Sequence, residues 1–448
     1  MSTSEPALVD RLRSRLSPAI AGAVAEAVTA AGASGLSLYL VGGSVRDLLL
    51  ERPHLDVDLV VEGDAAALAQ RVAAAVGARL VVHRRFGTAS LRGPEIRLDL
   101  ARARGEHYVR PGALPSVRPS TVAHDLARRD FSVNAMALGL SGEHAGRLLD
   151  PHGGRRDLTA RRLRILHDRS FQDDATRMLR GLRYEGRLGF RFEAGTRRLL
   201  TRDLAYLGTI SGPRLRREIL AILAEERPER ALVRAQALGV LAAVHPALSF
   251  DRRRAVAFAA ARRLPLASLI EVCFCLLTCE ATPAAVEGLV HRLALHGPLE
   301  RALRDALRLR QEMQRLAEPG LPPSQGVAIL KPFSPAAVAA VALLEPRGVI
   351  RTRLRRYLER WRYERPLLRG RDLEALGVTP SPVMGQMLAR LRVARLDGKA
   401  RSREDEVEMV RAWQHRVGAQ HAAPLQAADV SNRKRPRRGV PRAAEAEE

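Results

Sequence analysis

The chain has 448 residues, more than one hydrophobic core supports, because single cores stop growing at about 250 to 300 residues. Hydrophobic residues make up 46% of the sequence and charged residues 27%, which excludes an intrinsically disordered chain. The formal net charge of +25 favours a polyanionic partner, nucleic acid first and an anionic membrane second. Only Lys331, Lys399 and Lys434 are lysines, so nearly all basic residues are arginine, a bias for which genome composition is an alternative explanation.

Secretory and membrane classes are excluded by local patterns. Segment 1–6 has neither the basic nor the apolar region of a secretory signal. The longest apolar run, 265–279, contains Glu271 and is shorter than the roughly 20 residues that a membrane-spanning helix needs. Three cysteines cluster within 273–279, which argues against a disulfide framework, and their apolar surroundings predict buried side chains, not metal ligands. We expect a cytoplasmic protein that does not enter a membrane.

The first 150 residues alternate between the hydrophobic periods of strands and helices. The pattern predicts helices at 44–51 and 64–76, the second opened by Asp64 as an N-cap or first-turn acid. This order of elements indicates a mixed sheet with helices packed against it. The predicted strands are 36–41, 56–61, 79–85, 89–92 and 96–101.

The pattern changes after residue 104. Residues 104–121 (RGEHYVRPGALPSVRPST) contain three prolines and two glycines and are interpreted as a loop, long enough to be functional or mobile. Beyond about residue 155 the chain has helical spacing almost throughout, and proline-containing segments at 318–325 and 364–367 predict module boundaries. Residues 426–448 are predicted to be a solvated tail, with an RNA-contacting arm at the basic run 433–438 as the alternative. Early helices of this part are expected at 173–187, 195–202, 213–225 and 229–238.

The sharpest group of functional residue types follows the first predicted strand. Residues 41–47 (VGGSVRD) place a Gly-Gly pair between a strand and a helix, where bare N–H groups and the helix N-terminus favour a phosphate. Asp56 and Asp58 alternate with Val57 on a strand, so period two points both carboxylates to one face. Two acids this close resist ionisation unless a cation lies between them, and Mg²⁺ is the simplest solution.

Competing interpretations of these acids are kept open. Asp56 and Asp58 are alternatively exposed polar positions of an edge strand, although the glycine turn before them disfavours this. Asp99 is a candidate third carboxylate from a neighbouring strand, and an ordinary surface acid is equally compatible. The dipeptides 124–125 and 167–168, both His-Asp, resemble part of a metal phosphohydrolase site, but they lack further partners and are interpreted as incidental.

At this point the sequence resembles a known family. The order Gly-Gly-Ser, spacer, Asp-x-Asp is that of the nucleotidyltransferase superfamily, and further segments resemble class II tRNA nucleotidyltransferases and bacterial poly(A) polymerases. The resemblance covers roughly residues 36 to 225, and a weaker one at 370–377 and 396–398 is to the C-terminal domain of some bacterial members. Its segments are 39–61 (YLVGGSVRDLLLERPHLDVDLVV), 128–137 (RRDFSVNAMA), 150–158 (DPHGGRRDL), 171–183 (FQDDATRMLRGLR) and 210–218 (ISGPRLRRE).

The resemblance implies an α+β fold, in which a small mixed-sheet nucleotidyltransferase head is followed by an all-helical neck, body and tail. The implied domains are a catalytic head (1–150), a neck with a base-reading helix (151–230), an RNA-binding body (231–365), a C-terminal helical domain (366–425) and the tail (426–448).

The resemblance also implies roles for individual residues. Asp56 and Asp58 would hold the catalytic Mg²⁺, with Asp99 as a further catalytic candidate. The triphosphate is expected at Gly43 and Arg46 and the nucleotide at Arg129. Two more residues of the second motif support either the sugar or the motif itself: Asp130 and Asn134.

A polar stripe on the helix predicted from Asp173 offers a way to select a base without a template. A carboxylate only accepts and a guanidinium only donates, so Asp174 with Arg177 suits the amino group and ring nitrogen of cytosine or adenine. Uracil and guanine would leave both protein groups mismatched. Arg180 and Arg183 are the other nucleotide-binding candidates, expected at phosphates, and the competing interpretation is a solvated face with surface ion pairs. Departures from the family's usual residues put the base preference in question: Asp173, Ala175 and Thr176.

The sequence therefore predicts a Mg²⁺-dependent nucleotidyltransferase that adds C and A to the 3′ end of tRNA from CTP and ATP, releasing pyrophosphate. The alternatives are a poly(A) polymerase, an enzyme adding only CC or only A, and, from another class, a non-catalytic RNA-binding factor. The expected partners are the tRNA 3′ end and both nucleotides, with no membrane and no obligate protein partner. The positive charge is concentrated beyond residue 150, as expected if the helical part contacts an RNA backbone.

Overall fold

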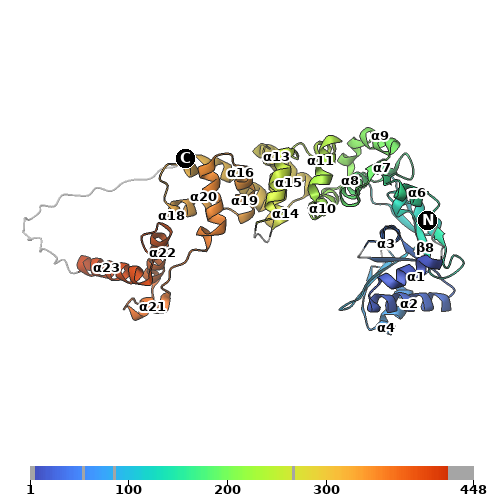
Figure 1. Ribbon diagram of the computed structural model, residues 1–448, viewed down its shortest axis with the longest axis horizontal. Helices are drawn as coiled ribbons and strands as arrows, with labels where there is room; N and C mark the ends of the chain where they lie inside the picture. Colours follow the sequence, from blue (N-terminus) through green and yellow to red (C-terminus); the bar gives the residue numbers. More distant parts are fainter. Residues whose placement is uncertain (1–5, 53–55, 84–86, 265–267, 422–448) are drawn as a thin grey trace, which may run out of the picture. The chain divides into compact units, whose positions relative to one another are not determined.

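The computed structural model describes residues 6–52, 56–83, 87–264 and 268–421 (Figure 1). It divides into two compact units, one built from residues up to 319 with 328–358, the other from 320–327 with residues from 359 onward. The predicted tail 426–448, with its basic run 433–438, lies outside the described residues, as do residues 265–267 of the apolar run. Domain limits at 150, 230 and 365 stay predictions.

A seven-stranded mixed sheet forms the head, in the order β3-β4-β5-β2-β1-β8-β9. β2 and β5 pair in parallel, and the remaining neighbours pair antiparallel. The predicted mixed sheet is confirmed, and each predicted strand is present in it. The strands are β1 (Ser37–Val41), β2 (Val57–Glu62), β3 (Arg79–His83), β4 (Thr88–Arg92), β5 (Arg97–Arg102), β8 (Ala137–Gly139) and β9 (Leu148–Leu149).

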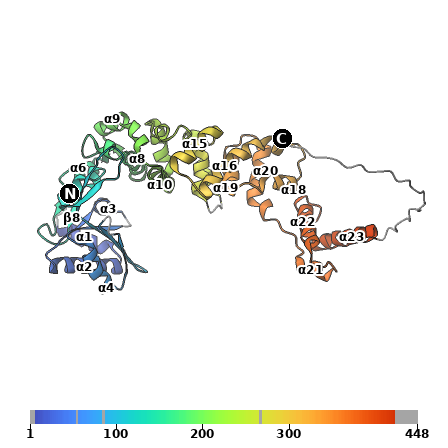
Figure 2. The same cartoon turned by 180° about the vertical axis from the view of Figure 1, so that it is seen from behind.

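Alternating residues of β1 supply the two hydrophobic cores of the head. Leu38 and Leu40 face a core shared with α1, α2 and α4, whereas Tyr39 and Val41 pack with α5 on the opposite face. Both views show α2 and α4 on one side of the sheet (Figures 1 and 2). Asp64 caps α4 as predicted, accepting hydrogen bonds from two backbone N–H groups. The helices are α1 (Pro6–Arg15), α2 (Pro18–Ala33), α3 (Gly43–Leu49), α4 (Ala65–Val76) and α5 (Val122–Ala127).

The predicted loop at 104–121 is wrong, because the segment folds into a hairpin. β6 (Arg104–His107) and β7 (Ser116–Pro119) form an antiparallel pair. Pro111 and Pro115 fall in the connection and Pro119 ends β7, so none of the three prolines interrupts the hydrogen-bond ladder. The hairpin tip is anchored on the neck, where Arg214 Nη1 donates to the carbonyl oxygen of Gly112 at 3.1 Å.

Beyond the head the chain is almost entirely helical, as predicted, and two short strands, β10 (Arg162–Leu163) and β11 (Arg191–Phe192), pair in parallel. α8 packs beside α10 and α11 (Figures 1 and 2). The neck helices are α6 (Gly154–Thr159), α7 (Ser170–Asp173), α8 (Thr176–Leu188), α9 (Ala194–Arg202), α10 (Gly212–Leu223) and α11 (Pro228–Ala237). The later ones are α12 (Val240–Val244), α13 (Arg252–Ala261), α14 (Leu269–Leu277), α15 (Pro283–Leu293), α16 (Pro298–Gln311), α17 (Met313–Ala317), α18 (Pro323–Leu330), α19 (Pro335–Leu344) and α20 (Gly348–Glu359).

Of the three cysteines predicted to be buried, Cys273 and Cys275 of α14 are buried, and Cys279 beyond the helix is partly buried. Cys273 and Cys275 are each 2% exposed, and burial raises the pKa of the Cys273 thiol to about 12, which leaves it an unreactive apolar side chain. Within the described part of the chain, no group of three or more His, Cys, Asp or Glu side chains is arranged to hold a metal ion. No single described helix is long and apolar enough to cross a membrane, and only α18 with α19, bent by 114°, meets that test as a pair.

The second unit is a small helical domain. Its core includes Leu373, Leu391 and Val410, one from each of α21 (Gly370–Ala375), α22 (Pro382–Leu396) and α23 (Arg403–His421). The weaker motif at 396–398 has a structural role, because Asp397 accepts hydrogen bonds from the N–H and hydroxyl of Ser324 at 2.9 and 2.8 Å.

Candidate active site

A pocket of about 620 Å³ lies between the head and the neck, within the range of small-molecule sites. Its walls come from α3, β2, the β6–β7 hairpin, the segment after α5, and α8. Most of the predicted site residues converge there, but Asp56 and Asp99 do not line it. Those that do are Gly43, Arg46, Asp58, Arg129, Asp174, Arg177, Arg180 and Arg183.

The glycine turn closes one end of this pocket. Gly42 has a φ of 68°, which favours glycine, and a Cβ atom there would overlap Arg129 Nη1. The guanidinium of Arg129 therefore packs directly on the turn. Ser44 Oγ accepts from the backbone N–H of Asp58 at 3.0 Å, which ties the start of α3 to β2.

The carboxylates lie beside the turn on neighbouring strands. Asp58 of β2 and Asp99 of β5 are register partners, and Asp56 immediately precedes β2, which begins one residue later than predicted. Asp58 is exposed as a residue, but its partial desolvation beside the neighbouring strands raises its pKa, and the charges of Asp99 and Asp56 raise it further, against the opposing effect of Arg129. Asp99 is engaged elsewhere, because its Oδ1 accepts from Ser90 Oγ and from Arg92 Nη2 at 2.5 and 2.8 Å.

Asp56 and Asp58 suit a hard divalent cation. Both are exposed, and no described side chain donates a hydrogen bond to either carboxylate. Carboxylate oxygens are the ligands such ions prefer, and a bound cation would oppose both effects that raise the pKa of Asp58, its partial desolvation and the charges of the neighbouring carboxylates. Two protein carboxylates leave most of the coordination shell to substrate oxygens and water.

A buried polar chain connects the turn to α8. Arg46 is 3% exposed and donates from Nη1 to Asn134 Oδ1 at 2.7 Å, and Asn134 Nδ2 donates to Asp130 at 2.9 Å. Arg180 Nη2 lies 2.7 Å from the other oxygen of Asp130. Burial opposes ionisation of Asp130, but Arg180 and Asn134 outweigh it and lower its pKa to about 2. Arg180 is thus held by a carboxylate, and Asp130 and Asn134 contribute to the structure of the motif, while a contact of either residue with the sugar stays a prediction.

The single helix predicted from Asp173 is wrong. The chain forms α7 and then α8, and Asp174 lies between them in an extended conformation, with φ −145° and ψ 95°. Its Oδ1 accepts from the N–H and hydroxyl of Thr176 at 3.0 and 2.6 Å, which caps α8. The sequence signal was present, because an acid two residues before a threonine favours such a cap. Of the four residues predicted to form the stripe, Arg177, Arg180 and Arg183 lie on α8 and Asp174 precedes it.

Asp174 and Arg177 nevertheless line one pocket, and both already have protein partners. Arg214 Nη2 lies 2.8 Å from Asp174 Oδ1. Arg177 donates to Ser170 Oγ at 2.6 Å and to the carbonyl oxygen of Arg128 at 2.8 Å. A nucleotide base reaching this pair would have to compete with these contacts or use the remaining atoms.

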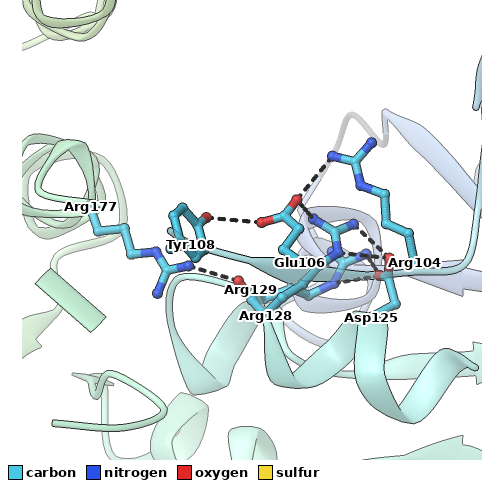
Figure 3. A network of polar contacts seen from close by, with 7 residues as sticks. All are labelled: Arg104, Glu106, Tyr108, Asp125, Arg128, Arg129 and Arg177. Carbon is cyan, nitrogen blue, oxygen red and sulfur yellow. Dashed lines mark hydrogen bonds and ion pairs between the residues drawn. The ribbon is translucent and has the colours of Figure 1, made fainter. Parts of the chain in front are cut away.

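Asp125 is the functional candidate that sequence reasoning missed, since His124-Asp125 was interpreted as incidental. Its side chain is fully buried and accepts from both Arg128 and Arg129, at 2.6 and 2.8 Å (Figure 3). Burial opposes its ionisation, but the charges of Arg129 and Arg128 outweigh this and lower its pKa. The available signal was the spacing, because acids three and four residues before arginines can pair with them on a helix.

The same network holds the hairpin against the head. Glu106 of β6 receives Arg128 Nη1 at 2.9 Å, Arg104 Nη2 at 3.2 Å and the hydroxyl of Tyr108 at 2.9 Å (Figure 3). The side chain of Glu106 is 8% exposed, so its charge is balanced by these two arginines. The predicted loop therefore supplies an ordered wall of the pocket.

Comparisons with known proteins agree with this geometry. Residues 38–164 match a family model described as "Poly A polymerase head domain", and residues 189–251 match "Probable RNA and SrmB-binding site of polymerase A". Fold and site thus define a nucleotidyltransferase head joined to a helical region.

Similar proteins of known activity indicate which family of nucleotidyltransferases the chain belongs to. An A-adding tRNA nucleotidyltransferase of Halalkalibacterium halodurans is 33% identical across 84% of this chain and 89% of its own length. A CC-adding tRNA nucleotidyltransferase of Deinococcus radiodurans is 35% identical over the same shares. An A-adding enzyme of Geobacter sulfurreducens is 33% identical across 84% of this chain, which spans 45% of that longer relative. The chain belongs to the tRNA nucleotidyltransferase family.

Solved structures of CCA-adding enzymes have the same fold. The Thermotoga maritima enzyme complexed with tRNA is 29% identical, with a TM-score of 0.71 over 91% of this chain and 98% of that one. A CCA-adding enzyme with CTP is 28% identical at 0.73, over 91% and 98% of the chains, and one with ATP is 28% identical at 0.72, over 90% and 98%. The α+β prediction and the family resemblance are thereby confirmed.

Proposed function

We propose that the protein adds C and A nucleotides to the 3′ end of tRNA, from CTP and ATP and without a template. One observation carries the proposal: a single pocket joins the head carboxylate Asp58 to the neck pair Asp174 and Arg177. Nucleotide transfer with base selection needs a site for the metal and triphosphate at one end of the pocket and a site for the edge of the base at the other. The solved relatives with tRNA, CTP and ATP support the choice of substrates, and a cytoplasmic location stays a prediction.

In the proposed reaction the 3′-oxygen of the RNA forms a bond to the α-phosphorus, and the bond from that phosphorus to the β-phosphate oxygen breaks, releasing pyrophosphate. Asp56 and Asp58 would hold Mg²⁺, which supplies acidification of the attacking hydroxyl and charge neutralisation at the α-phosphate. The N–H groups of the turn at Gly43 favour a phosphate of the nucleotide. Arg129, packed on this turn, adds positive charge where the triphosphate is expected.

Base selection is assigned to Asp174 and Arg177. The contacts described for Asp174 all use Oδ1, so we expect Oδ2 to accept the amino group of cytosine or adenine. Arg177 then donates to the neighbouring ring nitrogen. Uracil and guanine place a carbonyl and an N–H at these positions, and each buried mismatch costs about 1 to 3 kcal/mol.

A partial activity is the second candidate. The relatives matched across 84% of this chain are an A-adding and a CC-adding enzyme, so an enzyme that performs only one stage of CCA synthesis is also supported. Poly(A) addition would use the same pocket with different selection of RNA.

The test uses purified protein, Mg²⁺, labelled CTP, ATP or UTP, and three tRNAs that end before CCA, after CC, or with complete CCA. Full activity predicts two C additions and one A addition, then a stop. Extension of the first tRNA by CC alone, or of the second by A alone, would assign a partial activity. Long A tracts on complete tRNA would refute CCA addition, and UTP use matching CTP would refute the role of Asp174 and Arg177.

An inactive variant controls for contaminating enzymes and for the binding-factor alternative. Asp58→Ala should abolish incorporation and leave tRNA binding largely unchanged, because it removes a predicted metal ligand and no RNA contact. Full incorporation by this variant would refute the assignment of Asp58. Absence of incorporation by the unmodified protein, with tight tRNA binding, would support a non-catalytic RNA-binding factor.

A further inference from the structure

A second concave site adjoins the nucleotide pocket in the neck. It has a volume of about 460 Å³ and is lined by five arginines and two glutamates, a net charge of +3. Arg183 and Arg187 of α8 line both pockets, so the two share a wall. The remaining arginines come from the segment after α3, from the α10–α11 turn and from α11: Arg52, Arg227 and Arg230.

The helices that carry these arginines are closely packed. A Cβ atom on Gly186 of α8 would lie 3.1 Å from the backbone nitrogen of Ala231 on α11, so glycine allows the two helices to approach. Glu185, which is 1% exposed, receives Arg234 Nε at 2.9 Å and thereby links the same two helices. Arg183, Arg187 and the first turn of α11 therefore stand on a rigid base.

The donors of this site lack good acceptors within the protein. Arg183 faces Glu218 and Glu225 at 3.9 and 3.7 Å, beyond hydrogen-bond distance, and its buried Nε has no partner among the described residues. Arg187 and Arg230 form no ion pair with any described residue, and Arg227 has only an exposed contact of 3.9 Å to Glu226. A buried guanidinium N–H without an acceptor is costly, which favours an anionic ligand.

We propose that this second pocket binds a backbone phosphate of the RNA close to its 3′ end. The planar fork of arginine matches phosphate oxygens, and several arginines around one cavity suit a phosphodiester better than a single carboxylate. The shared wall places this phosphate on the RNA that enters the nucleotide pocket. The inference rests on the proposed function, because it takes RNA as the molecule that enters that pocket.

The test removes two arginines that lie outside the nucleotide pocket. Arg227→Gln with Arg230→Gln is compared with Arg197→Gln and Arg198→Gln, two exposed arginines of α9 that line neither pocket, so both double variants lose the same charge. The first pair should raise the KM for tRNA about tenfold and leave the KM for CTP unchanged. It should also make the salt dependence of tRNA binding shallower by roughly 0.7 to 0.9 per lost contact in the log–log slope.

A modified RNA locates the contact. Single uncharged methylphosphonate linkages are placed one at a time near the 3′ end of a tRNA lacking CCA, and binding is titrated without nucleotide. One position should weaken binding to the unmodified protein about tenfold and have no further effect on the Arg227/Arg230 variant. If no position shows this loss of additivity, the pocket does not hold a backbone phosphate.

The outcomes separate this inference from the proposed function. Equal weakening by both double variants would overturn the inference, since it would reflect general charge loss. A rise in the KM for CTP alone would also overturn it, by assigning the pocket to the triphosphate. If the unmodified protein adds no nucleotide, the proposed function fails, while the tRNA titrations still decide whether the phosphate is bound here.

Discussion

Asp125→Asn tests whether the buried carboxylate holds Arg129 on the glycine turn. In the structure Asp125 accepts four hydrogen bonds, two from Arg128 and two from Arg129. The substitution removes the negative charge and turns an –NH₂ group toward guanidinium donors. Breaking a buried ion pair costs about 3 to 5 kcal/mol. Because the side chains of Arg128 and Arg129 are 19% and 18% exposed, we expect a smaller loss of stability, about 2 to 3 kcal/mol.

Calorimetry of the whole chain measures the stability loss, which corresponds to a fall in Tm of about 4 to 12 °C for the transition that includes the head. Steady-state kinetics measures the second consequence. Released Arg129 no longer packs on Gly42, so the KM for CTP and ATP should rise about tenfold, and Asp125→Glu should restore part of it. Asp305→Asn is the control, because it removes a buried, arginine-paired carboxylate from α16, away from the pocket.

Two results would refute this reasoning. An unchanged Tm would mean that the Asp125 network contributes nothing to stability. A lower Tm with nucleotide KM values equal to those of Asp305→Asn would mean that Asp125 is structural only and does not position Arg129.

The remaining predictions concern stability at low pH, the glycine turn at Gly42 and the second compact unit. Asp130 has a pKa of about 2 against an ordinary 3.8, so its ion pair stabilises the fold by about 2 kcal/mol above pH 4, and this stability is lost as the pH falls from 4 to 2. Asp130→Asn should flatten the stability profile over that window, and an unchanged profile contradicts the assignment. Gly42→Ala should lower the free energy of unfolding by about 1 to 3 kcal/mol and impair nucleotide binding, because it strains a positive φ and displaces Arg129. The control is Gly32→Ala in α2, where a Cβ atom would meet nothing within 4 Å. This control should change neither the Tm in melting assays nor the nucleotide KM in kinetic assays. Glu406→Gln should lower the Tm of the second unit only, since this buried carboxylate accepts hydrogen bonds from the N–H groups of Leu367 and Leu368. Hydrogen exchange measures this, and the increase should be confined to residues from 359 onward. Increased exchange in the head would count against the prediction.

The sequence predicted the features that depend on local periodicity and backbone chemistry. The succession of strand and helix patterns predicted the mixed sheet, Asp64 predicted a helix start, and the Gly-Gly pair predicted a phosphate-compatible turn at Gly42 and Gly43. It failed where polar side chains decide the structure. The β6–β7 hairpin has no hydrophobic alternation, and Asp174 ends one helix and begins another by a side-chain cap that period counting does not detect.

By itself, then, the sequence predicted which residues carry chemistry, from the residue types at Asp58, Arg129, Asp174 and Arg177 and from the motifs in which they stand, and these roles stay predictions. Only the tertiary structure decided which of them have partners. Asp99 is bound by Arg92, Arg180 is held by Asp130, and Asp125 anchors two arginines, whereas the donors of Arg183 lack close acceptors. The physical reason is that ion pairs and hydrogen bonds require contact within a few ångströms. Contacts such as that between Asp130 and Arg180 join residues far apart in the chain, and residue spacing carries no record of those.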